Sequence, residues 1–162
     1  MVDNNSLRRE IGSFYDSYYA AYVEVIAGRP TADEYFYRKY YSIPLYVNEA
    51  ESGDADASGK RSRWLLTDSD IHDFLLAGRE TLEARDYHHS NILDRVIRVL
   101  NGNRVNLEIV VSRRRADDTE VERWAVGYGI AKFEAGWRII DIYTTITAAD
   151  TVAATWPPTV YA

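Results

Sequence analysis

The stretch that decides the fold is "HHSNILDRVIRVLNGNRVNLEIVVSRRRADDTEVERWAVGYGIAKFEAGWRIIDIYTTIT", residues 88–147. Apolar residues recur at every second position through most of it, which is the spacing of strands whose side chains alternate between two faces. The segments "NGN" (101–103), "ADDT" (116–119) and "AG" (135–136) have the composition of turns. The pattern predicts four long antiparallel strands in sequential hairpins, at 88–100, 103–115, 120–133 and 137–147.

Upstream of residue 88 the apolar spacing is mostly helical. A long amphipathic helix is predicted over 6–27, ending at "GRP", and a short one over 32–41, where Thr31 and Glu34 of "TADE" can form a capping box. Thr67 and Asp70 can open a third helix that runs to about residue 82. Short strands are predicted at 43–50 and 63–66, and the acidic segment "ESGDADASGK" (51–60) is expected to be a mobile hairpin loop.

This order of elements predicts one α+β domain over residues 1–162, in which three N-terminal helices pack on a strongly curved, mostly antiparallel sheet. The core is expected over about 6–147, with an extended C-terminal tail at 148–162. Hydrophobic residues make up 46% of the chain and aromatic residues 13%, including thirteen tyrosines, so a sizeable core can form without covalent cross-links.

Composition also limits the function. A net charge of −6 and the lack of a basic run argue against nucleic-acid binding. The absence of cysteine excludes disulfides and thiolate metal sites, and no apolar run is long enough to cross a membrane. With no leader-like N-terminus, we expect a cytoplasmic protein.

Turn chemistry predicts the register of the sheet. If Asn101 and Gly102 form a two-residue hairpin loop, Arg95 lies opposite Glu108, and strict alternation then defines one nearly apolar face that must meet the helices. This face holds Ile92, Val96, Leu100, Val105, Leu107, Ile109, Val111, Trp124, Val126, Tyr128, Ile130, Ile139 and Tyr143. Small and polar residues occupy the opposite face, which is expected to be wet or to pair with another subunit.

Four polar residues fall on the predicted apolar face: His88, Asp94, Arg98 and Asp141. Asp141, between Ile139 and Tyr143, is the strongest candidate for a general base, because burial among apolar groups raises the pKa of a carboxyl group. The alternative is a purely structural role, in which Asp141 is hydrogen-bonded to a tyrosine of a helix.

The two adjacent histidines and the tyrosines complete the candidate site. His88 and His89 point to opposite faces of a strand, so they cannot hold one metal together, and we expect no metal or other cofactor. His88 is expected near the mouth of a cavity, although a solvated histidine at the start of a strand is the alternative. Residues expected to approach one interior and bind a substrate are Tyr18, Tyr22, Tyr40 or Tyr41, Trp124, Tyr128 and Tyr143. Such a cavity suits a small hydrophobic or aromatic ligand.

Three segments resemble the NTF2-like superfamily, particularly its SnoaL-like branch: "AYVEVIAGRPTADEYFYRKYYSIPLYV" (21–47), "HHSN" (88–91) and "FEAGWRIIDIYTTI" (133–146). The resemblance covers roughly residues 6–147 and implies a cone of helices over a curved sheet, commonly dimerised through the outer face of the sheet. Members include ketosteroid isomerase, scytalone dehydratase, polyketide cyclases, dioxygenase β subunits and non-catalytic binding proteins.

The functional residues of the superfamily carry over only in part. Asn48 and Gly129 stand near the positions of the two acids of ketosteroid isomerase, which disfavours steroid isomerisation, while Tyr22 falls near its tyrosine. His88 or His89 resembles the histidine of the dehydratase, and Asp141 the acid/base of the cyclases.

The sequence therefore predicts a cofactor-independent cyclase, dehydratase or isomerase that acts by acid/base catalysis, with Asp141, His88, His89 and Asp94 as candidate catalytic residues. The alternatives are a non-catalytic small-molecule-binding or accessory protein and a structural subunit of the dioxygenase β type. A homodimer is expected, through a face with Arg95, Asn106, Glu108, Ala125, Gly127 and Gly129.

Overall fold

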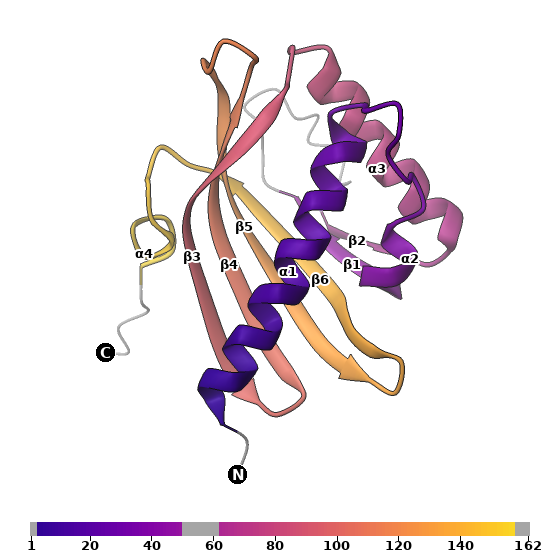
Figure 1. The fold of residues 1–162 in the computed structure, drawn as a ribbon, viewed down its shortest axis with the longest axis vertical. Helices are drawn as coiled ribbons and strands as arrows, with labels where there is room; N and C mark the ends of the chain where they lie inside the picture. The colour runs from indigo at the N-terminus through magenta and orange to yellow at the C-terminus, as the bar shows by residue number, and fades with distance from the viewer. Residues whose placement is uncertain (1–2, 50–61, 158–162) are drawn as a thin grey trace.

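A six-stranded sheet carries the two long helices on one face (Figure 1). The computed structural model describes residues 3–49 and 62–157, so the mobile loop predicted at 51–60 lies outside the described residues. The elements in chain order are α1 (Asn4–Ile26), α2 (Tyr37–Tyr40), β1 (Tyr41–Asn48), β2 (Ser62–Leu65), α3 (Asp68–Glu83), β3 (His89–Asn101), β4 (Arg104–Arg114), β5 (Glu120–Phe133), β6 (Gly136–Ile146) and α4 (Val152–Thr155).

The strand order in the sheet is β2-β1-β6-β5-β4-β3. Strands β3 to β6 pair antiparallel with their neighbours in the chain, which confirms the predicted hairpins. β1 runs parallel to β6 and antiparallel to β2, so the sheet is mixed. The predicted α+β class, with helices on a curved and mostly antiparallel sheet, is confirmed.

The ends of the long helices follow from local side-chain chemistry. Asp3 caps α1 by accepting hydrogen bonds from two backbone amides, and α1 ends just before Gly28, whose φ of +66° is unfavourable for residues with a Cβ atom. At α3, Thr67 and Asp70 form the predicted capping box.

The predicted helix at 32–41 is wrong in extent, because only Tyr37–Tyr40 is α-helical. Its expected capping box does not form. Asp33 accepts a hydrogen bond from the amide of Tyr35 at 2.9 Å, which stabilises a turn, and Glu34 pairs with Arg79 of α3 at 3.0 Å. Local hydrogen bonds of aspartate compete with helix formation in this way.

The core lies between the helices and the concave face of the sheet. Its largest fully buried side chains include Ile11, Tyr15, Tyr18, Leu45, Ile71, Leu107, Ile109, Ile130 and Ile139. Burying one such side chain is worth about 1.5–3 kcal/mol, so this layer is the main source of stability. Along residues 3–49 and 62–157, no helix combines the length and apolar character needed to cross a bilayer.

The predicted register between β3 and β4 holds from His89 to Ile92 and is wrong by one residue from Asp94 to Val99, because the register shifts at Leu93. Arg95 lies opposite Ile109, and Glu108 lies opposite Val96. The hairpin loop is Gly102-Asn103 rather than Asn101-Gly102, because the side chain of Asn101 accepts a hydrogen bond from the amide of Asn103 at 2.8 Å. Arg95 therefore points toward the helices and pairs with Asp16 of α1 at 2.6 Å.

A second irregularity changes the face on which the C-terminal half of β6 presents its side chains. The register shifts between the pairs Gly129–Asp141 and Ile130–Ile139, which leaves Ile140 as an extra residue. Beyond it, Ile142 is buried in the helix-covered core, while Asp141 contacts Arg104 on the opposite face, here called the outer face. The prediction that Asp141 and Tyr143 lie on the helix-covered face is wrong.

Residues 148–157, here called the C-terminal strap, pack on the outer face. The strap is not wholly extended as predicted, because it contains α4, which lies beside β3 and away from α1 (Figure 1). Val152 is 1% exposed and packs in a small cluster with Val110 and Ala125. Its amide donates to the Asp94 carboxylate at 2.8 Å, which holds the start of α4 against β3.

Candidate functional site

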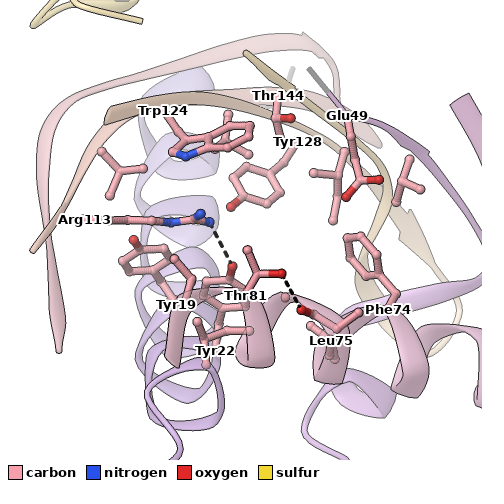
Figure 2. A pocket seen from close by; sticks show the side chains of 18 of the residues that line it. Tyr19, Tyr22, Glu49, Phe74, Leu75, Thr81, Arg113, Trp124, Tyr128 and Thr144 are labelled. Atoms are coloured by element: carbon pink, nitrogen blue, oxygen red, sulfur yellow. Dashed lines mark hydrogen bonds between the residues drawn. The ribbon is translucent and has the colours of Figure 1, made fainter. Parts of the chain in front are cut away.

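A cavity of about 480 Å³ lies among α1, α3 and the concave face of the sheet. Figure 2 shows its interior, with Arg113 reaching between Trp124 on one side and Tyr19 and Tyr22 on the other. Its apolar walls come from the sheet and the helices, and include Leu75, Phe74, Ile109, Val111, Val126 and Ile142. This size and character are typical of small-molecule sites.

Five of the six residues predicted to bind a substrate line this cavity: Tyr18, Tyr22, Tyr41, Trp124 and Tyr128. The exception is Tyr143, whose hydroxyl donates to Glu108 on the outer face at 2.9 Å. The hydroxyls of Tyr18 and Tyr41 share a hydrogen bond of 2.7 Å. Burial raises the pKa of both phenols, so they are neutral hydrogen-bonding groups at physiological pH.

The principal charged group of the interior, Arg113, was not among the predicted site residues. It lies opposite Glu122 in the β4–β5 ladder, and its Nη1 atom donates to Glu122 Oε1 at 3.0 Å. Arg85, which follows α3, donates to the other oxygen of Glu122 at 2.6 Å. The side chains of Arg113 and Glu122 are only 19% and 12% exposed, so this pair is well shielded from water.

Alternation along β4 and β5 contained the signal for this pair. Val111 and Trp124 were both assigned to the helix-covered face, and the next position outward on each strand is Arg113 and Glu122. The sequence analysis assigned neither Arg113 nor Glu122 to a face of the sheet, so it did not predict the pair.

Burial and neighbouring charges act in opposite directions on Glu122. Desolvation would raise the pKa of its carboxyl group, but hydrogen bonding from Arg85 and the charge of Arg113 outweigh it and lower the pKa. The indole N–H of Trp124 acts in the same direction without reaching hydrogen-bonding geometry. Glu122 is therefore ionised at neutral pH and weakly basic.

A pair of charged side chains, Glu49 and Arg63, lies across the cavity from Arg113. Figure 2 shows Glu49 of this pair beside Phe74. The Arg63 guanidinium is 3.7 Å from the Glu49 carboxylate and also lies over the Phe74 ring. Polar side chains thus lie on two sides of a cavity whose middle is apolar.

None of the four predicted catalytic residues lines the cavity. Asp141 accepts hydrogen bonds from the Gly129 amide at 3.0 Å and from Arg104 Nη2 at 3.1 Å, both on the outer face. Asp94 binds the amides of Arg95 and Val152. These two carboxylates therefore connect backbone segments of the outer face.

The two adjacent histidines are at or near the surface. His88 is exposed, and its Nδ1 lies 3.2 Å from Nδ1 of His89, whose other ring nitrogen lies 3.0 Å from Asp118. This arrangement corresponds to the alternative reading of a solvated histidine at the start of a strand. Within the described residues, no group of three or more His, Asp or Glu side chains is placed to hold a metal ion.

Solved structures with this fold come from several bacteria. A domain of unknown function with a cystatin-like fold from Nostoc punctiforme has a TM-score of 0.59 and 14% identity, over 91% of this chain and 81% of the other. An NTF2-like superfamily protein from Salmonella enterica has a TM-score of 0.58 and 16% identity, over 93% and 97%. A protein described as a candidate ketosteroid isomerase from Parabacteroides distasonis has a TM-score of 0.53 and 11% identity, over 80% and 84%.

These likenesses show the fold alone, because the identities are low and one fold serves many functions. No curated protein matches the chain. The sequence does match a described family over residues 9–147, which include most of α1, all of α2 and α3, and the sheet. The chain belongs to the family described as NTF2-like protein (DUF6841).

Proposed function

We propose that this protein binds a small, mostly apolar molecule in the cavity among α1, α3 and the sheet. The observation that carries the proposal is the cavity of about 480 Å³, in which apolar and aromatic walls surround a few fixed polar groups. Apolar walls supply affinity, and the Tyr22 hydroxyl and the Arg113 guanidinium can orient a polar end of the ligand.

Binding is favoured over proton transfer by the chemistry of the groups present. A general base works best when its pKa is close to the operating pH. The pKa of Glu122 is lowered, and burial raises the pKa values of Tyr18, Tyr41 and Tyr128. Neither kind of group is tuned to exchange protons near neutral pH.

A cofactor-independent cyclase, dehydratase or isomerase is the second candidate, favoured by one specific observation. Glu122 is an ionised carboxylate inside a largely apolar cavity, and Arg113 beside it also donates to Tyr22 at 3.4 Å. A guanidinium next to a phenol can stabilise an oxyanion that develops on a substrate. If such a reaction occurs here, we expect these three residues, rather than Asp141, to carry it.

The binding proposal is tested by filling the cavity from its wall. Thr81 of α3 lines the cavity, is accessible to solvent and points into the interior in Figure 2, so Thr81→Trp places an indole in the ligand space. Glu80→Trp, at an exposed neighbouring position outside the lining, is the matched control. We expect calorimetric titration with 2-naphthol to show binding to wild type and to Glu80→Trp, and at least about tenfold weaker binding to Thr81→Trp.

Equal affinity of Thr81→Trp and wild type would place the binding elsewhere and contradict the proposal. Turnover of an enolisable or hydroxylated aromatic compound, lost in Glu122→Gln while binding is retained, would make the enzyme the better reading.

A further inference from the structure

The charged side chains of the cavity are not balanced. The described lining contains three arginines, at positions 63, 85 and 113, and two glutamates, at positions 49 and 122. Three guanidinium groups against two carboxylates leave one positive charge, although the whole chain carries a net charge of −6. The cavity thus favours a negatively charged guest against the overall field of the protein.

The excess charge lies on the side of the cavity where Arg113 enters. Across from it, Glu49 and Arg63 form a neutral pair. Around Glu122, one carboxylate is held between Arg113 and Arg85, with its two oxygens accepting at 3.0 and 2.6 Å. Two guanidinium groups thus share one carboxylate, and Arg113, whose side chain is 19% exposed, is better shielded from water than Arg85, whose side chain is 41% exposed.

Arg113 has hydrogen-bonding capacity that the described residues do not use fully. A guanidinium has five N–H donors. Within residues 3–49 and 62–157, one binds Glu122, and another reaches the Tyr22 hydroxyl at 3.4 Å, close to the longest distance of a hydrogen bond. The remaining donors are available to a ligand in the cavity, and an anionic ligand would form charge-assisted hydrogen bonds with them.

Two further donors lie beside Arg113. The Tyr22 hydroxyl accepts from Arg113, so its own proton can be donated to a ligand. The centre of the Trp124 ring lies 5.3 Å from the Arg113 guanidinium carbon. Its buried indole N–H helps to lower the pKa of Glu122 but forms no hydrogen bond of good geometry in the described part of the chain. A guanidinium, a phenol and an indole N–H therefore gather on one side of the cavity.

We propose that the ligand is an apolar carboxylic acid whose carboxylate binds at Arg113 and Tyr22, with the Trp124 N–H close by. Its apolar body lies along Val111, Val126 and Leu75 on the walls of the cavity. A neutral carbonyl or hydroxyl group could accept from the same donors, but it would not balance the positive charge. This inference rests on the proposed function and narrows it to one class of ligand.

The test compares two probes of nearly the same shape, the anionic naphthalene-1-acetic acid and the neutral naphthalene-1-acetamide, by calorimetric titration at pH 7.5. Wild type is expected to bind the acid about tenfold more tightly, because a hydrogen bond to a charged group is stronger than one to its neutral counterpart. Arg113→Gln is expected to weaken binding of the acid more than binding of the amide, and so to remove this preference. Glu122→Gln removes the competing carboxylate and is expected to increase the preference.

The matched control is Arg38→Gln, since Arg38 pairs with Asp68 on the surface and lies outside the cavity lining. It is expected to leave both affinities unchanged. If Arg113→Gln does not fold, Glu122→Gln carries the test alone, because an unchanged or smaller preference in this variant overturns the proposal.

The remaining outcomes separate this inference from the proposed function. Wild type could bind both probes with equal affinity, and Thr81→Trp could lose both. This result would support the proposed binding function and would overturn the preference for an acid. Absence of binding of either probe at millimolar concentration would overturn both.

Discussion

Asp141 shows how a single carboxylate can stabilise a sheet from the side opposite its cavity. It accepts from the Gly129 amide and from Arg104, and it is 27% exposed, so both bonds are partly shielded from water. Gly129 leaves the space that the Asp141 carboxylate occupies, because a Cβ atom there would overlap with it unless the carboxylate moved.

We therefore expect Asp141→Asn to act on stability rather than on binding. The amide keeps the shape of the side chain but weakens the charge-assisted bond to Arg104, so the free energy of unfolding should fall by about 1 kcal/mol. Thermal denaturation and titration with 2-naphthol measure the two effects separately. Asp150→Asn, at an exposed carboxylate of the strap that pairs with Arg123, is the control and should change stability by less than about 0.5 kcal/mol. Loss of binding without a change in stability would return Asp141 to the list of site residues.

The misplacement of Asp141 in the sequence analysis has a physical cause. Alternation from Ile139 puts Asp141 on the helix-covered face, whereas one extra residue at Ile140 buries Ile142 in its place. Burying an isoleucine instead of a carboxyl group gains about 1.5–3 kcal/mol and avoids desolvating a charge. In the run "IIDI", the extra residue moves the side chains that follow it to the other face of the sheet, and strict alternation does not predict this.

At the scale of elements, α2 and α3 are joined by one cluster of polar bonds. The Asp68 carboxylate, in the first turn of α3, accepts from the Tyr37 hydroxyl at 2.9 Å and from Arg38 at 2.9 and 2.8 Å. Hydrogen bonding from Arg38 lowers the pKa of Asp68 from 3.8 to about 2. Asp68 thus links Tyr37 and Arg38, two of the four residues of α2, to α3.

This cluster predicts a pH dependence of stability. The pKa of Asp68 is lower in the folded chain, so its contribution is complete above the unfolded value of 3.8 and is lost as the pH falls toward about 2. In urea denaturation, Asp68→Asn should therefore be less stable than wild type at pH 6, and the difference should shrink between pH 4 and pH 2.5. Asp73→Asn, at an exposed aspartate of α3, is the control. A difference that stays constant down to pH 2.5 would contradict this assignment.

The bounds of the strands were predicted more accurately than the register in which the strands pair. The predicted bounds of the last four strands agree with the structure to within one residue, since long alternation with turn residues leaves few alternatives. The register of β3 failed because both of its faces are apolar in the middle. Ile97 and Val99 pack against the core, while Val96 packs in the cluster under the strap. The sequence did not predict that the strap packs on the outer face, because "WPP" was the only distinctive pattern in the C-terminal tail.

For the whole molecule, the strap decides what the outer face can bind. Val152 covers Val110 and Ala125, which are apolar residues of that face, and leaves polar groups such as Arg98, Glu108 and Asp141 around it. The homodimer expected from the sequence stays a prediction, and so does its use of this face. A partner docking there would have to contact the strap as well as the strands, because the strap lies between it and the apolar cluster.

The dimer prediction can now be tested at an exposed position. Ala153 on α4 follows the buried Val152 and is accessible, so Ala153→Asp adds a charge to the outer surface of the strap without entering the core. If two copies meet through this face, burying the new carboxylate should weaken the dimer by about tenfold or more while the thermal stability of the protomer is unchanged. Sedimentation velocity over a micromolar concentration series measures the dissociation constant, with Ala116→Asp in the β4–β5 turn as the matched control. Two results would contradict the dimer through this face: a wild-type protein that sediments as a monomer at every concentration, or a dimer that Ala153→Asp weakens no more than Ala116→Asp does. Either result would show that the strap covers the outer face without forming part of a dimer interface.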